Sequence, residues 1–136
     1  MDARIIEPSV TPERSAVIEL GGQKYELVLT TLATKSIARR YGGLDKLGEK
    51  LTNYENFEDA LDEIVWLITL LANQSVLIHN LWNEDKKPLL TEETVELLTT
   101  PYDLSEYKNQ IMAAMYKGAK RHVESEAENE KNSSAE

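Results

Sequence analysis

The longest apolar stretch of the chain runs from Phe57 to Trp82, and its apolar residues recur at steps of three and four. That spacing predicts a helix with a wide apolar face. The predicted stripe is Phe57, Leu61, Ile64, Ile68, Leu71, Ile78 and Trp82. Asn56 stands where an N-cap belongs. We therefore expect a long central helix against which the other elements pack, with its break or bend at Asn73 and Gln74.

The apolar run inside this segment also raises the question of a membrane span. Ile64–Ala72 contains one polar residue, Thr69, but acids precede the run and Asn73 and Gln74 follow it. A spanning helix needs about 20 apolar residues. The pattern favours a buried core helix, and no membrane partner is expected.

Residues 15–29 alternate between apolar and polar positions on either side of Gly21-Gly22, which predicts a β-hairpin with a two-residue turn. On the return strand, Tyr25, Leu27 and Leu29 would face the core. The more solvated set would be Lys24, Glu26 and Val28. An isolated hairpin is marginally stable in water, so it must pack on a helix or pair with another chain.

Cap and stop signals predict four further helices. Thr30 or Thr31 would cap a helix over about 31–41 that ends at Gly42-Gly43. The others are expected over 44–51, 92–98 (capped by Thr91) and 104–122, the last after a break at 99–103 that contains Pro101. The fold class is therefore mainly α with an N-terminal β-hairpin (α+β). We expect one globular domain over 15–123, a flexible arm over 1–14 and a disordered acidic tail over 124–136.

Charge and composition narrow the function. The 136 residues hold 24 acids and 15 bases, a net charge of −9, which disfavours general binding to nucleic acid or anionic membranes. The chain has no cysteine, so disulfides and thiolate chemistry are excluded. The first residues lack a hydrophobic signal core, so the expected location is the cytoplasm of the cell that makes the protein.

Catalytic and metal-binding patterns are missing. His79 and His122 are 43 residues apart. The acids Asp59, Asp62 and Glu63 are ordinary for the first turns of a helix. We expect no enzyme activity, catalytic residue, cofactor or metal.

Residues 34–51 offer an alternative function. Two short helices about a glycine turn resemble a helix-turn-helix, and the segment carries five bases and two acids. The bases are Lys35, Arg39, Arg40, Lys46 and Lys50. A small DNA-binding regulator is therefore the second hypothesis. A solvated basic face explains the same residues more simply, because the second helix is short and has an acid near its start.

The run from the hairpin to the central helix, IELGGQKYELVLTTLATKSIARRYGGLDKL followed by an acidic turn and an apolar helix, carries a family resemblance. A Gly-containing hairpin, a strand leading into a Thr-capped helix and a Tyr-Gly-Gly stop occur in that order. The matching residues are Gly21, Gly22, Tyr25, Leu27, Leu29, Thr30, Leu32, Ile37, Arg40, Tyr41, Gly42, Gly43 and Leu44. This pattern resembles the tail assembly chaperones of long-tailed bacteriophages and prophages, of the kind common in phages of Gram-positive hosts. The similarity covers Val17 to Leu71, about 40% of the chain.

The resemblance implies a non-enzymatic assembly factor that acts in the cytoplasm of the bacterial host and is absent from the finished virion. Its implied partners are the tape-measure protein, which it keeps soluble, and tail-tube subunits, recruited in some cases through a frameshifted longer form. For the contact surface we predict Tyr25, Val28, Leu32 and Tyr41, with a core role as the competing interpretation of all four. Self-association through the hairpin edges stays open.

Overall fold

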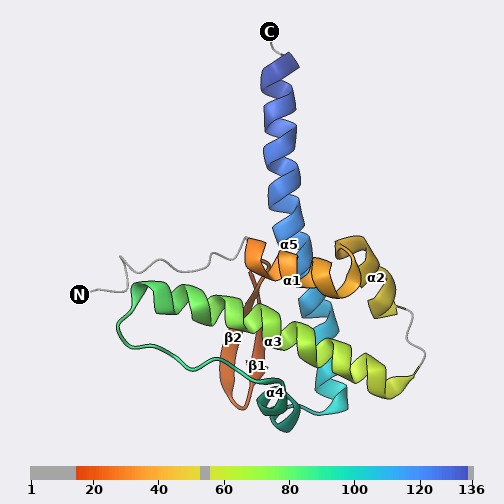
Figure 1. The fold of residues 1–136 in the computed structure, drawn as a ribbon, viewed down its shortest axis with the longest axis vertical. Helices are drawn as coiled ribbons and strands as arrows, with labels where there is room; N and C mark the ends of the chain where they lie inside the picture. The colour runs from red at the N-terminus through yellow and green to blue at the C-terminus, as the bar shows by residue number, and fades with distance from the viewer. Residues whose placement is uncertain (1–14, 53–55, 135–136) are drawn as a thin grey trace.

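The computed structural model describes residues 15–52 and 56–134, and Figure 1 shows a helical body built around a short hairpin. The elements in chain order are β1 (Ser15–Leu20), β2 (Gln23–Val28), α1 (Thr31–Tyr41), α2 (Leu44–Thr52), α3 (Phe57–Trp82), α4 (Glu92–Leu98) and α5 (Pro101–Ser134). The predicted class, mainly α with an N-terminal β-hairpin, is confirmed. The arm expected over residues 1–14 lies outside the described residues.

The long helix α3 crosses the body, with the hairpin and α5 against it (Figure 1). It begins as predicted at the N-cap Asn56, whose side-chain oxygen accepts from the Asp59 amide at 2.8 Å. Side chains from the middle of α3, among them Leu67 and Ile68, are fully buried. At the two ends of the helix the predicted burial of the apolar stripe is wrong. Phe57 is 67% exposed and Trp82 is 64% exposed.

The length and apolarity of α3 also meet the criteria for a membrane span. The mean hydropathy of its most apolar 18-residue window is 1.5, and 44% of that window is buried inside the protein. Buried core helices of soluble proteins share this composition. In this fold the apolar side chains of α3 form the core together with the hairpin and α5.

The break predicted at Asn73 and Gln74 is wrong, because α3 is continuous through both residues. Each of the two side chains forms at least one hydrogen bond with a residue distant in sequence. The Asn73 amide donates to the Leu90 carbonyl at 2.9 Å and accepts from the Leu90 amide at 2.8 Å. Gln74, only 4% exposed, donates to the Leu70 carbonyl at 3.0 Å and accepts from the Thr30 hydroxyl. These residues tie α3 to its neighbours.

The hairpin forms with the predicted two-residue turn. Leu20 pairs with Gln23 across Gly21 and Gly22, whose φ angles of 56° and 82° belong to the left-handed region that a type I′ turn requires. The expected alternation fails on β2, because Leu27 and Val28 are both fully buried. β2 contacts α3 and α5, so both of its faces are covered near its end. The prediction of a solvated Val28 is therefore wrong.

The outer edge of β1 is closed by side chains of α5. The carbonyls of alternate residues point to the same side of a strand. The Tyr107 hydroxyl donates to the Glu19 carbonyl, and the Lys117 ammonium donates to the Ser15 carbonyl at 2.7 Å. Two acceptors on the edge facing away from β2 are therefore occupied.

The short helices begin and end at the predicted signals. The Thr30 hydroxyl accepts from the Ala33 amide at 3.0 Å and caps α1, while Gly42, with φ of 96°, ends it by donating to the Ala38 carbonyl. Thr91 caps α4 in the same way.

The last helix, α5, starts earlier and ends later than predicted. Pro101 is its first residue, which suits a position whose N–H has no helical partner. Thr100 and Asp103 cap the helix reciprocally, each side chain accepting from the other's amide, at 3.2 and 3.0 Å. The break is therefore shorter than 99–103.

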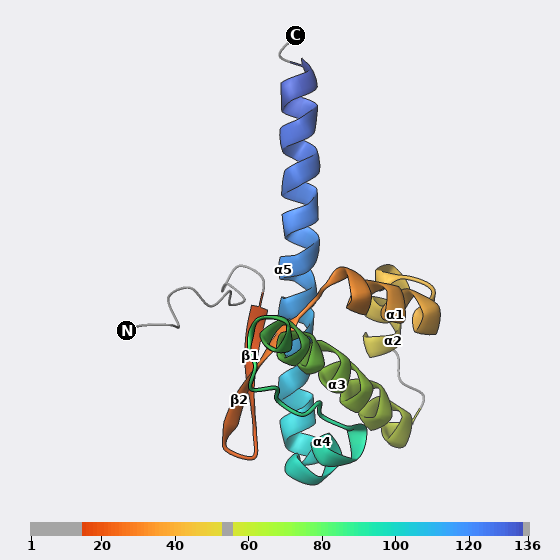
Figure 2. The ribbon, with the colours of Figure 1, turned by 60° about the vertical axis from the view of Figure 1, so that its left-hand side comes forward.

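At its other end α5 continues as helix to Ser134, where an end near 122 and a disordered tail were expected. Figures 1 and 2 show this part extending away from the body. Residues 119–134 contain no glycine or proline and many Ala, Glu and Lys residues, which favour helix. Residues 135 and 136 lie outside the described part of the chain.

Candidate partner-binding site

Several large apolar side chains are exposed to solvent at the C-terminal end of α3. Leu77 is 39% exposed, Leu81 is 75% exposed and Trp82 is 64% exposed. At 100° per residue these three positions fall within an arc of about 140° on the helix. We call Leu77, Leu81, Trp82 and the nearby Leu89 the α3 end patch.

The loop after α3 brings Leu89, 50% exposed, back to this end of the helix. The Asn80 side chain donates to the Lys87 carbonyl at 3.0 Å and accepts from the Lys87 amide at 2.9 Å. Asn73 clamps Leu90 in the same way. Leu89 therefore lies between two points of the loop that are anchored to the C-terminal half of α3. These two asparagine clamps fix the loop in place, so the patch has a defined shape.

The four predicted contact residues do not form one surface. Val28 is fully buried, and Tyr25 is half-buried, with its hydroxyl donating to the Gln23 side chain at 3.2 Å. Leu32 is 57% exposed, while Tyr41 is half-buried. Leu32 and Tyr41 are nine positions apart in α1, so they lie on roughly opposite faces of the helix. Of the four, Leu32 is the one with an exposed apolar side chain.

Tyr41 instead belongs to a polar cluster that joins α1 to α3. Arg40 donates to the Glu63 carboxylate through Nε at 3.2 Å and Nη2 at 3.5 Å, and the Tyr41 hydroxyl donates to the same carboxylate. The Arg40 guanidinium also lies 4.4 Å from the centroid of the Trp66 ring, which Tyr41 meets edge-on. We call Arg40, Tyr41, Glu63 and Trp66 the α1–α3 latch. Burial, and then the bond to Glu63, raise the pKa of Tyr41, so its hydroxyl stays a donor at neutral pH.

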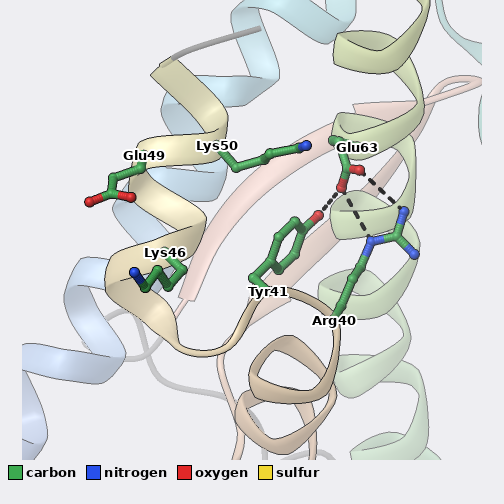
Figure 3. Close-up of a pocket in the computed structure, with 6 residues that line it drawn as sticks. All are labelled: Arg40, Tyr41, Lys46, Glu49, Lys50 and Glu63. Carbon is green, nitrogen blue, oxygen red and sulfur yellow. Dashed lines mark hydrogen bonds and ion pairs between the residues drawn. The ribbon is translucent and has the colours of Figure 1, made fainter.

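Beside the latch lies an open pocket of about 540 Å³. Figure 3 shows its residues, contributed by the end of α1, by α2 and by α3. Its lining is Arg40, Tyr41, Lys46, Glu49, Lys50 and Glu63. The pocket is polar, in contrast to the α3 end patch.

Of the five basic residues that the helix-turn-helix hypothesis would use, Arg40 is part of the α1–α3 latch. The Arg40 guanidinium points to Glu63 on α3 and stacks on Trp66, so it is engaged within the fold. The other four bases remain exposed: Lys35, Arg39, Lys46 and Lys50. A duplex-binding surface on α1 and α2 would therefore rest on four cations with Asp45 and Glu49 among them.

The remaining candidate groups for chemistry are used structurally. His79 approaches the Asp85 carbonyl at 3.2 Å through Nε2 and the Asn83 side chain at 3.2 Å through Nδ1, at the start of the loop after α3. Among the side chains that the structure describes, no three carboxylate or histidine groups gather to hold a metal ion.

Neither the latch nor the α3 end patch was predicted from the sequence. Trp82 was assigned to the buried stripe because it keeps the helical spacing. Leu77 and Leu81 lie four residues apart near the helix end, and this spacing is the one feature of the sequence that indicates a shared apolar face there. The latch joins residues 23 positions apart and has no local signal.

Comparison with protein-family models, with curated proteins and with solved structures finds no match for this chain.

Proposed function

We propose that this protein is a phage tail assembly chaperone that binds the tape-measure protein, keeps it soluble and helps to recruit tail-tube subunits. The observation that carries the proposal is the α3 end patch, an exposed apolar surface held in shape by asparagine clamps. Three of its side chains belong to one helix end and the fourth to an anchored loop. Several exposed apolar side chains at one end of a helix are typical of a protein-interaction site.

The sequence resemblance supports the same proposal. It rests on the glycine-turned hairpin, the Thr30-capped helix and the Gly42 stop, and all three elements are present in the fold. A tape-measure protein is expected to expose apolar helical seams before the tail tube covers it. An apolar patch beside a helix is suited to the apolar face of such a helix. Leu32, exposed at the start of α1, remains a further candidate contact.

The test is co-expression with a tape-measure fragment from the same genome, followed by pull-down and a solubility assay. We expect the wild-type protein to keep the fragment soluble and to co-elute with it. The double variant L81Q/W82Q should lose most of this capture, because it removes the two most exposed apolar groups of the patch. The matched control is L97Q, which removes an equally exposed leucine, 77% accessible, from α4.

Different outcomes of this experiment test the chaperone role and the use of the α3 end patch. A fragment that stays insoluble and unbound beside folded wild-type protein would contradict the chaperone role. Equal capture by wild type and L81Q/W82Q would move the contact away from the α3 end patch. Salt-sensitive binding to duplex DNA, measured on the same preparation, would favour the regulator alternative instead.

A further inference from the structure

The pocket beside the latch has a charge balance that differs from that of the whole chain. Arg40, Lys46 and Lys50 oppose Glu49 and Glu63 in its lining, which leaves one positive charge on a protein whose net charge is −9. A local cationic site on an acidic protein attracts anions to that place in particular.

The positive charge resides on α2. The Glu63 carboxylate is already occupied by Arg40 and by the Tyr41 hydroxyl. Lys46 and Lys50 are one helical turn apart on α2, and in Figure 3 their ammonium groups diverge, with that of Lys46 on the side of Glu49. Neither lysine forms an ion pair within the described residues. In Figure 3 Lys50 extends across the pocket toward Glu63, while Glu49 points away from it.

We infer that this pocket binds a carboxylate side chain presented by an acidic segment of a protein partner. One net positive charge matches one carboxylate better than a doubly charged phosphate. The open shape of the pocket admits a group displayed on a larger molecule. The guanidinium of Arg40 is held by Glu63 and Trp66, so the Lys50 ammonium that extends across the pocket supplies the donor, and Lys46 adds positive charge to the lining. This site is separate from the α3 end patch and does not depend on the chaperone role.

The test is titration of the full chain with a hexaglutamate peptide at low ionic strength, followed by amide chemical shifts in NMR. Saturable shifts should centre on α2 and Tyr41 and should weaken as salt is added. The variant K46A/K50A should bind roughly tenfold more weakly, because it removes both ammonium charges. Both lysines are exposed, so the variant should fold, and circular dichroism checks this.

The control variant K24A/K35A removes the same charge from exposed lysines on β2 and α1. It should retain the affinity of the wild type within about twofold, since neither lysine lines the pocket. Absence of saturable shifts, or equal weakening by both double variants, would overturn the site. Inorganic phosphate is titrated in parallel, and tighter binding of phosphate than of hexaglutamate would overturn the assignment to carboxylates.

Discussion

Removing the carboxylate of the α1–α3 latch by Glu63→Ala should lower the free energy of unfolding by about 2–4 kcal/mol. The hydrogen bond from the Tyr41 hydroxyl to this charged, 15% exposed acceptor contributes about 1.5–3 kcal/mol. The ion pair with Arg40 adds only about 0.2–1 kcal/mol, because that side chain is 37% exposed and screened by solvent. Urea unfolding followed by circular dichroism measures the change.

A double-mutant cycle isolates the Tyr41–Glu63 pair. Tyr41→Phe alone should cost about 1–2 kcal/mol. The double variant should be more stable than the sum of the single effects predicts, by about 1–2 kcal/mol. Additivity within about 0.5 kcal/mol would refute the hydrogen bond as a stabilising contact. Asp62→Ala, an exposed neighbour on α3, is the control and should change stability by less than about 0.5 kcal/mol.

Two further substitutions test contacts inside the body. Gln74→Leu should lower the free energy of unfolding by about 1–3 kcal/mol, as measured by urea unfolding. The reason is that the Thr30 hydroxyl loses its buried acceptor and the Leu70 carbonyl loses a donor. Gly118→Ala places a Cβ 2.9 Å from Leu29 Cδ2 and 3.0 Å from its Cβ. Overpacking of about 1–3 kcal/mol should exceed the gain of about 1 kcal/mol in helix propensity, so thermal unfolding should occur at a lower temperature.

Gly118→Ala and Gln74→Leu each have a matched control substitution. Gly48→Ala in α2 introduces a Cβ with no atom within 4 Å, so it should stabilise the protein by about 0.5–1 kcal/mol. If Gly118→Ala stabilises equally, the close approach of α5 to Leu29 is not tight. Gln23→Leu, at an exposed position, should leave the urea midpoint nearly unchanged. An unchanged midpoint for Gln74→Leu as well would argue against the bond to Thr30.

Local chemistry made much of this fold predictable. Thr30, Asn56 and Thr91 each cap the helix that follows them, and Gly42 ends α1, as expected. A cap needs a partner only two or three residues away, so the sequence around it contains the whole interaction. The reciprocal cap of Thr100 and Asp103 has such a local signal as well.

Long-range partners explain what the sequence did not predict. Asn73 and Gln74 interrupt the apolar run of α3, and the partners that account for them are 17 and 44 residues away. Val28 follows an alternating pattern, but helices cover both faces of its strand. The latch likewise depends on Glu63 lying beside Arg40 in space. Each of these features is fixed by how the elements pack, which a pattern along one segment does not contain.

The donors that Tyr107 and Lys117 supply to β1 have a consequence for how partners can engage the hairpin. A two-stranded sheet normally offers its free backbone to any extended peptide, which can extend the sheet as a third strand. Here an incoming strand on the β1 side would first have to displace α5, and with it Leu104 and Ile111 from the core. Strand exchange at this side is therefore coupled to partial unfolding. Recognition at the β1 edge that leaves the fold intact must take place through side chains.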